Sequence, residues 1–250
     1  MITQHVLRNR QGGELTQDER TVLESAFTET RTHSAGKIVV RAGAAVETST
    51  LLLDGLMTRH VDDRDGRRHL VALHVPGDFV DLHAYVLKAL DHDVGALTDV
   101  TVGVVPHAAL RRIQAGHAHL TRRLWFLTML DAALHRQWVY RLSSLDALGR
   151  VAQFLCETNA RLLAIGISDG SSFSLPMTQV DIGEVCSLTN VHVSRVLREL
   201  RRQELCTVRS SAVEIHDLQG LAAAGRFQPG YLYLNEATAL RASGQPARTL

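Results

Sequence analysis

The first half of the chain shows the two-residue alternation of apolar and polar positions that is typical of β-strands. The alternating apolar runs lie at 51–53, 56–61, 69–75 and 100–104. Asp54-Gly55 separates the first two, and Asp-Gly between alternating runs is a strong signal for a hairpin. Many short strands with glycine-containing turns between about 37 and Pro106 predict a small barrel or jelly roll.

After Pro106 the apolar residues recur every three or four positions, which predicts helices. The stripe of the first long helix consists of Leu120, Leu124, Leu127, Leu130, Leu134, Trp138 and Leu142. Two interpretations stay open: the helix lies on its own barrel, or it forms a seam with the same helix of a second subunit. A second helix is predicted from Leu145 to about Leu163, with a loop at 166–172 after it. We place a domain boundary near Ser143-Ser144.

A pair of short helices is predicted between Thr178 and Arg202. Thr178 and Asp181 have the spacing of a capping box, and Thr189 caps a second helix after a tight connection at 186–188. The core positions of that second helix are Val193, Val196, Leu197 and Leu200. Two short helices joined by about three residues match a helix-turn-helix.

The outward positions of the second helix have the chemistry that reads DNA. Arg bonds the two acceptors of guanine, and Asn bonds adenine, with ~1–3 kcal/mol of discrimination for each bidentate pair. Asn190 and Arg195 have these side chains, while Arg198, Arg201 and Arg202 add charge for phosphates, opposed within the helix by Glu199. In an isolated helix such arginines would more simply form a solvated face. The capped partner helix favours the nucleic-acid interpretation.

The segment after this helix adds to that interpretation. Alternating residues at 205–208 and 212–215 flank the polar turn Arg209-Ser210-Ser211, which predicts a short hairpin, or wing. The residues predicted to touch DNA are Thr178, Thr189, Asn190, Val191, Ser194, Arg195, Arg198, Arg202, Arg209 and Ser210.

Composition narrows the alternatives. The 45% apolar and 21% charged residues are ordinary for a globular chain of 250 residues, which has room for two domains. With 27 Lys and Arg against 26 Asp and Glu, bulk charge gives no argument for a nucleic-acid or membrane partner. No apolar run of membrane-span length and no signal peptide is found, so we expect a cytoplasmic protein without a membrane partner. Three isolated cysteines suit reduced core thiols.

Over about residues 14–225 the chain resembles the Crp/Fnr family of bacterial transcription regulators. The resemblance lies in Leu52-Leu53-Asp54-Gly55, in Val75-Pro76-Gly77-Asp78-Phe79, in 96–99, and more specifically in 177–183 and 188–197. It implies an α+β fold with an N-terminal jelly-roll β-barrel as sensory domain (14–115), a long dimerisation helix (116–143) and a C-terminal winged helix-turn-helix (144–225). It also implies a homodimer on two-fold symmetric double-stranded DNA and contact with RNA polymerase. The tail at 226–250 has no functional account and is expected to be frayed or partner-dependent.

The chain departs from the family at its effector sites. Members that bind cyclic AMP have an Arg beside a Ser or Thr in the phosphate cassette, whereas 80–94 here contains Asp81, Asp91 and Asp93 and no arginine. We therefore expect no cyclic AMP binding. No cysteine precedes Cys156, which disfavours the iron-sulfur cluster of the oxygen-sensing branch. The effector is unknown, and no cofactor is predicted.

Five histidines (His60, His69, His74, His83 and His92) lie across the predicted barrel. One of them is a candidate heme or metal ligand, but no metal-ligand spacing is found, so solvated or hydrogen-bonded histidines are the simpler interpretation and no metal site is predicted. The family usually has Glu where Val191 stands, so we expect a different operator, and Val191 is suited to a thymine methyl.

Two other functions suit parts of the sequence. His74, His83 and the Pro-Gly-Asp turn in a β-rich region suit a cupin-like metal enzyme, which lacks its His-x-His pair here and leaves the second half unexplained. A cyclic-nucleotide-type signalling module without DNA contact is disfavoured by the acidic cassette and the wing. Because no catalytic constellation is recognisable, we expect no enzyme.

Overall fold

The structure is a computed structural model that describes residues 1–245, and the chain divides into two compact units. The front unit consists of Met1–Arg8 and Glu14–Ala132. The rear unit consists of Asn9–Gly13 and the chain from Ala133 onward. Helix α4 (Ala118–Ser144) contributes its first part to the front unit and its last part to the rear unit.

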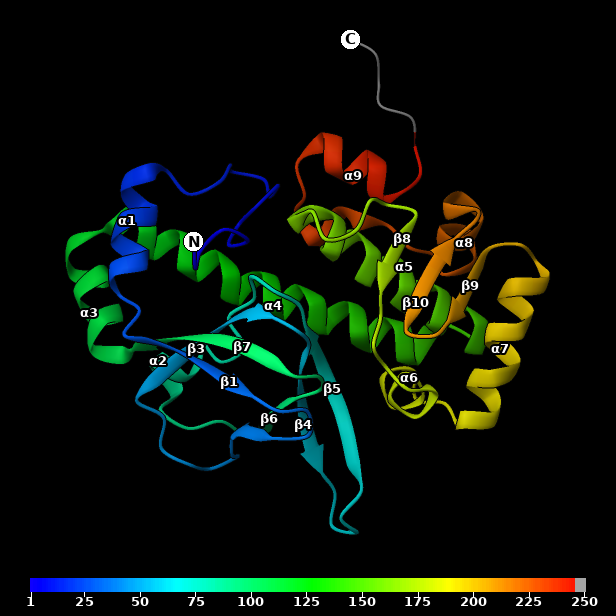
Figure 1. The fold of residues 1–250 in the computed structure, drawn as a ribbon, viewed down its shortest axis with the longest axis horizontal. Helices are drawn as coiled ribbons and strands as arrows, with labels where there is room; N and C mark the ends of the chain where they lie inside the picture. Colours follow the sequence, from blue (N-terminus) through cyan, green and yellow to red (C-terminus); the bar gives the residue numbers. More distant parts are fainter. Residues whose placement is uncertain (246–250) are drawn as a thin grey trace. The chain divides into compact units, whose positions relative to one another are not determined.

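Two antiparallel sheets form the front unit (Figure 1). Their strands are β1 (Glu29–His33), β2 (Ile38–Val40), β3 (Thr48–Asp54), β4 (Met57–Asp62), β5 (Arg68–His74), β6 (Asp93–Ala96) and β7 (Val100–Pro106). The three-stranded sheet has the order β1-β7-β3 and the four-stranded sheet the order β2-β6-β4-β5. Leu52 and Val102 of the first sheet share one apolar cluster with Met57 and Val94 of the second. The expected jelly roll is thus confirmed, as two sheets packed on one another rather than a closed barrel.

The turn between β3 and β4 lies where the Asp-Gly pair predicts it. Gly55 has φ +84, and a Cβ there would lie 2.3 Å from the carbonyl oxygen of Asp99. The first strand, in contrast, begins at Glu29, before the predicted start at about residue 37. β1 is an almost wholly exposed strand whose residues lack apolar alternation, so the sequence contains no period-two signal there.

Three further helices belong to the front unit: α1 (Gln17–Ser25), α2 (Ala84–Leu87) and α3 (His107–Gly116). Figure 1 shows α1 and α3 beside one another at one end of the sheets. Leu23 of α1, Ile113 of α3 and Leu120 of α4 share a core cluster with Leu51 of β3. This cluster fixes the helices on the sheets by burying their apolar sides.

Helix α4 has two different apolar sides. Leu120 and Leu124 belong to the front core, and Leu130 and Trp138 are also buried, so much of the predicted stripe packs inside its own subunit. Its other members, Leu127, Leu134 and Leu142, are half-buried. The large apolar residues of α4 left most exposed are Trp125, Met129 and Val139, at 67%, 53% and 67%, followed by Tyr140 at 37%. These residues are the largest apolar groups that α4 leaves available to a second subunit.

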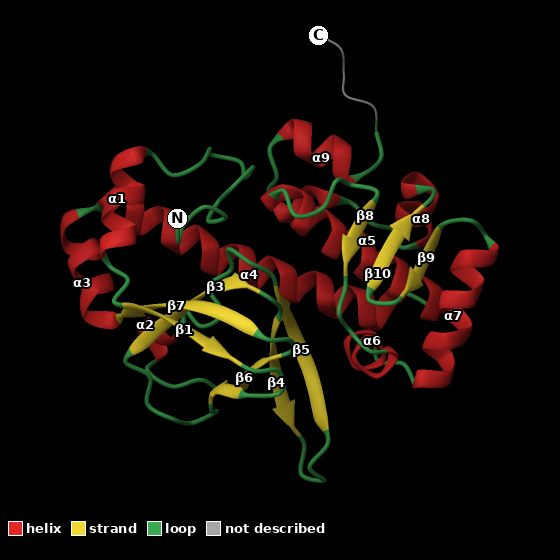
Figure 2. Ribbon diagram, viewed as in Figure 1, coloured by secondary structure: helices red, strands yellow, loops and turns green. Residues whose placement is uncertain are grey.

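The rear unit is built around α5 (Ala147–Ile165), whose residues from Val151 onward are buried on all sides. Around it lie α6 (Gln179–Cys186), α7 (Asn190–Arg202), α8 (Leu218–Ala224), the 3₁₀ turn η1 (Pro229–Leu232) and α9 (Glu236–Ala242). A small sheet has the order β8-β10-β9, with β8 at Ser172–Ser174, β9 at Cys206–Arg209 and β10 at Ala212–Ile215 (Figure 2). Strand β8 starts inside the predicted loop; only Phe173 of its three residues is buried, which is too little for a sequence signal.

The tail is ordered through residue 245, so the expectation of a frayed end is wrong there. Residues 9–13 hold it: Arg10 forms a β-bridge with Leu234 and donates to the carbonyl oxygen of Leu232. Asn9 donates from Nδ2 to the carbonyl oxygen of Ala164 at 2.7 Å and accepts from the amide of Asn235 at 2.8 Å. The expectation for 246–250 lies outside the described residues.

Cys156, Cys186 and Cys206 are buried free thiols, as the sequence analysis expects. Burial raises the pKa of Cys186 to about 11 and that of Cys206 to about 12. Within residues 1–245, none of the helices combines the length and the apolar character that crossing a bilayer requires.

Candidate nucleic-acid interface

Helices α6 and α7 form the predicted helix-turn-helix. Thr178 accepts from the amide of Asp181 at 3.1 Å, and the carboxylate of Asp181 accepts from the amide of Thr178 at 2.7 Å, which completes the capping box. Helix α6 ends at Ser187, which has the left-handed φ of 53. The hydroxyl of Thr189 then accepts from the amide of His192 and starts α7. Both predicted caps are confirmed.

The turn between the helices is fixed from two sides. A Cβ on Gly183 would lie 2.6 Å from the carbonyl oxygen of Leu188, so only glycine allows the turn to close against α6. On the other side Arg150 of α5 donates to the carbonyl oxygen of Leu145 at 2.9 Å and to that of Cys186 at 3.4 Å. Sequence reasoning did not single out Arg150, because its role depends on where α5 packs.

Helix α7 separates its apolar and basic residues sharply. Val193, Val196 and Leu200 are buried against the rest of the unit. The opposite side consists of Val191, Arg195, Arg198 and Arg202, which are exposed and follow one another at steps of four, three and four residues. These steps place the four side chains on one outward stripe, which we call the α7 stripe.

The structure places nine of the ten predicted DNA-contact residues on the surface and Ser194 at a half-buried position. Thr178 and Thr189 act as helix caps, so their hydroxyls already have partners. Among residues 1–245, the guanidinium groups of Arg195 and Arg198 have no hydrogen-bond or ion-pair partner. They are therefore free to bind an anion.

Arg202 differs from the expectation. It donates to both carboxylate oxygens of Glu199, from Nε at 2.8 Å and from Nη2 at 2.6 Å. These bonds from Arg202, with one from Gln203, lower the pKa of Glu199 to about 2. Glu199 thus binds the arginine that the sequence analysis gave to phosphates, because residues three apart in a helix are neighbours. Arg195, Arg198, Arg201 and this pair line a hollow of about 420 Å³.

The wing is a hairpin of β9 and β10, in which Arg209 pairs with Ala212. Ser210 and Ser211 have φ values of 50 and 61, as a two-residue turn of type I′ requires. Arg209 is exposed beside that turn. The predicted hairpin is confirmed, with β8 as an additional strand on β10.

The interior of the front unit contains an arginine that the sequence analysis missed. Arg59 of β4 is 2% exposed and donates from Nε and Nη2 to the carbonyl oxygen of Val80, at 2.9 and 2.7 Å. Its Nη1 donates to Asp131 of α4 at 2.7 Å. Arg59 lies outside the stretch 80–94 in the sequence, and β4 brings its side chain to the carbonyl oxygen of Val80.

The three acidic residues of that stretch have separate environments. Asp81 is wholly buried and accepts from the amide of Thr50, and burial raises its pKa to about 7. Asp91 is exposed and bonds His92 at 2.7 Å, whereas Asp93 accepts from the amide of Ala42 at 2.6 Å. Burial lowers the pKa of His74 and of His83 to about 4. Within residues 1–245, no group of three His, Cys, Asp or Glu side chains is placed to hold a metal ion.

Comparison with known proteins agrees with these two units. Residues 30–117 match the family model of the cyclic nucleotide-binding domain, and residues 149–224 match that of the Crp-like helix-turn-helix domain. The nitrogen fixation regulation protein FixK of Bradyrhizobium diazoefficiens is 30% identical over 177 residues, which cover 69% of this chain and 73% of that protein.

The transcriptional activator protein FnrL of Cereibacter sphaeroides is 28% identical over 177 residues, which cover 69% of this chain and 70% of that protein. Among solved structures, FixK2 from Bradyrhizobium japonicum superposes with a TM-score of 0.72 at 23% identity, covering 78% of this chain and 96% of the other. This last likeness concerns the fold.

Proposed function

The chain belongs to the Crp/Fnr family of DNA-binding transcription regulators, and from this premise we propose that it binds a two-fold symmetric operator as a homodimer. In each subunit α7 enters the major groove. The observation that carries the proposal is the α7 stripe, on which Arg195 and Arg198 are exposed and unpartnered among the described residues. Helix α7 presents a basic surface, and an α-helix has the dimensions that this groove admits.

The ten predicted contact residues divide by chemistry. Asn190, Val191 and Arg195 read base edges, because they lie in the first two turns of α7. Arg198 and Arg209 bind phosphates, and Arg202 joins them once it leaves Glu199. Ser194, Ser210 and the two cap threonines, Thr178 and Thr189, give shorter polar contacts to the backbone of the duplex.

The second subunit binds along the exposed side of α4. Trp125, Met129 and Val139 lie there at helical spacing, and apolar side chains of this size gain by leaving water. Parallel packing of two such helices forms an isologous interface, in which each residue meets its own copy or a near neighbour. Two recognition helices then face two half-sites about one helical turn, ~34 Å, apart.

The front unit acts as a sensory domain that does not bind cyclic AMP. Asp131 and the carbonyl oxygen of Val80 engage the Arg59 guanidinium, so it has little capacity left for a phosphate. Asp81 nearby also disfavours an anion once it is ionised. The protein regulates transcription in the cytoplasm through contact with RNA polymerase and catalyses no reaction.

Selection of binding sites from random double-stranded DNA with the purified full chain tests the proposal. We expect an enriched inverted repeat, protected as one dimer per site. An asymmetric single motif, or no enrichment over the input library at physiological salt, would overturn it. Isothermal titration with cyclic AMP in the same preparation should show no saturable binding.

A further inference from the structure

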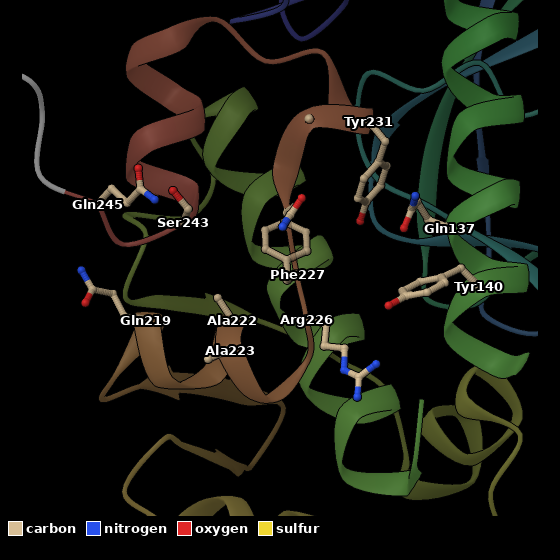
Figure 3. A pocket seen from close by; sticks show the side chains of 12 residues that line it. Gln137, Tyr140, Gln219, Ala222, Ala223, Arg226, Phe227, Tyr231, Ser243 and Gln245 are labelled. Atoms are coloured by element: carbon tan, nitrogen blue, oxygen red, sulfur yellow. The ribbon is translucent and has the colours of Figure 1, made fainter. Parts of the chain in front are cut away.

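A hollow of about 990 Å³ opens in the rear unit outside both the recognition surface and the sheets (Figure 3). Its walls come from the end of α4, from α8, and from the segment between Arg226 and Gln245. That whole segment lies beyond residue 224, where the match to the Crp-like helix-turn-helix domain ends. The cavity is therefore built largely by the additional C-terminal segment that residues 9–13 hold in place.

The walls combine aromatic rings with one charge. The rings of Phe227 and Tyr231 meet edge to face with centroids 6.2 Å apart, and Tyr140 of α4 faces them in Figure 3. Arg226 is the one charged side chain among the described residues that line the cavity. It has no hydrogen-bond or ion-pair partner through its guanidinium within residues 1–245. A cavity of this kind favours a flat ligand with a single negative charge.

The backbone at Arg226 supports a role for its side chain. Helix α8 ends in a Schellman motif: the amide of Arg226 donates to the carbonyl oxygen of Ala223, and that of Phe227 to that of Ala222. Arg226 occupies the left-handed position of this motif, with φ 46. Glycine is the usual residue there because a side chain strains this conformation. This motif fixes the backbone at Arg226, so the exposed side chain starts from a defined position at the cavity wall.

The cavity wall also joins a buried polar network. The hydroxyl of Tyr231 donates to Glu157 of α5 at 2.7 Å, and Glu157 lies 3.8 Å from the guanidinium of Arg141. Arg141 of α4 is wholly buried, donates to Gln153 at 2.9 Å and stacks on Trp138 at 4.4 Å. A ligand against Tyr231 would thus touch the group that connects α4 with α5.

We propose that this cavity binds a small aromatic carboxylate. Arg226 pairs with the carboxylate, and Phe227 and Tyr231 contact the ring. Tyr140 and Gln137 of α4 supply a hydroxyl and an amide on the opposite wall. The site lies outside residues 30–117, so it is distinct from the cyclic nucleotide-binding domain. It does not depend on the proposed operator binding.

Isothermal titration of the full chain with 2-naphthoate, and separately with its neutral counterpart 2-naphthamide, tests the charge requirement. We expect saturable binding of one naphthoate per chain and about tenfold weaker binding of the amide, since the amide lacks the charge-assisted pair with the guanidinium. Absence of saturable naphthoate binding at millimolar concentration, or equal binding of the two probes, would overturn the proposal.

The variant Arg226→Gly tests the residue without endangering the fold. We expect naphthoate binding to weaken at least about tenfold while the thermal midpoint rises by about 2 °C, because glycine relieves the left-handed strain. Arg112→Ala, at an exposed position of α3 in the other unit, is the control and should bind naphthoate as the unaltered chain does. Unchanged naphthoate binding by Arg226→Gly would place the probe elsewhere and refute the assignment.

Discussion

The arginine side chains of α7 differ from one another in their contacts. Four arginines lie between Arg195 and the end of α7, but they are not equivalent. Arg202 is bonded to Glu199 by two short hydrogen bonds, whereas Arg195 and Arg198 are free among the described residues. The ion pair is accessible to solvent, so Arg202 can exchange Glu199 for a phosphate. Glu199 thereby reduces the basic charge of α7 in the absence of DNA.

The variant Glu199→Gln should therefore bind all DNA more tightly. Removal of the carboxylate releases Arg202, which then makes one additional phosphate contact. The slope of log K against log salt concentration should become steeper by about 0.9, and the affinity about tenfold higher at 0.1 M salt. Fluorescence anisotropy with operator and scrambled duplexes, over a series of salt concentrations, measures both. Glu236→Gln on α9 removes the same charge away from α7 and serves as the control. An unchanged salt slope would contradict the expected release of Arg202.

Arg195 and Arg198 should differ in their effect on specificity. Arg195→Ala should lose ~1–3 kcal/mol of discrimination at one base pair of each half-site, because it removes a base contact. Arg198→Ala should weaken all sequences alike and flatten the salt slope by about one phosphate. Binding of the two variants to a set of single-base operator changes measures the difference. Equal loss of specificity in both would show that the assigned roles are wrong.

The buried histidines should make the front unit sensitive to acid. The folded unit keeps His74 and His83 neutral down to about pH 4, while the unfolded chain protonates both below about 6.5. The unfolded state then binds more protons, so stability falls as the pH decreases from 6.5 to 4. Asp81, with a pKa of about 7 in the folded unit, has the opposite effect. The folded state takes up a proton at Asp81 as the pH falls below 7, and this proton offsets about one of the two that the histidines bind in the unfolded state.

The measurement is urea unfolding of the full chain between pH 4.5 and 6.5. His74→Gln should reduce the slope of the unfolding free energy against pH by the equivalent of about one bound proton. The control is His69→Gln, at an exposed histidine, and should leave that slope as in the unaltered chain. This slope remains a valid measure even if His74→Gln lowers the unfolding free energy by the same amount at every pH. The same slope in His74→Gln as in the unaltered chain would contradict the assignment.

At the scale of the element, the turn of the helix-turn-helix depends on one glycine. Gly183→Ala places a Cβ within 2.6 Å of the carbonyl oxygen of Leu188, which must then move away from α6. We expect a loss of about 1–3 kcal/mol of stability and a larger loss of operator affinity, since α7 is displaced with the turn. Thermal unfolding and operator titration measure these effects. Gly230→Ala, whose Cβ would meet nothing within 4 Å, should change neither; a similar loss in both variants would argue against the steric cause.

Elements with a strong local signal were predicted correctly from the sequence, and those without one were not. Thr178 and Thr189 cap α6 and α7 as expected, because a cap is decided by residues within one helical turn. Strands β1 and β8 were missed because they are short or exposed, and their pairing partners lie far away in the sequence. The same reason explains Arg59, which reaches the interior only through the pairing of β4.

At the scale of the whole molecule, the sequence did not indicate which apolar side of α4 stays exposed. A stripe of leucines on α4 was compatible with packing inside or between subunits, since periodicity does not tell which apolar side meets which partner. Only the packed structure shows that Trp125 and Met129 remain exposed. The ordered tail was missed for a similar reason, because residues 9–13 stabilise it from the opposite end of the chain.

The subunit interface can be tested through Met129→Glu. A carboxylate from each subunit would be buried without a partner in the proposed dimer, so dimer dissociation should increase at least ~100-fold, and operator binding should weaken with it. Sedimentation velocity over a concentration series measures the dissociation. Ala115→Glu, at an exposed position of α3, adds the same charge away from α4 and should leave the dimer intact. A Met129→Glu variant that stays dimeric would exclude this side of α4 as the interface.

The short segment at residues 9–13 affects the order in which the rear unit folds. Arg10 bonds Leu232, a residue 222 positions later in the chain. Contacts of such separation form late, since a long stretch of chain must first be closed into a loop. The contact between residues 9–13 and the segment around Leu232 is therefore expected to be among the last of the rear unit to form during folding.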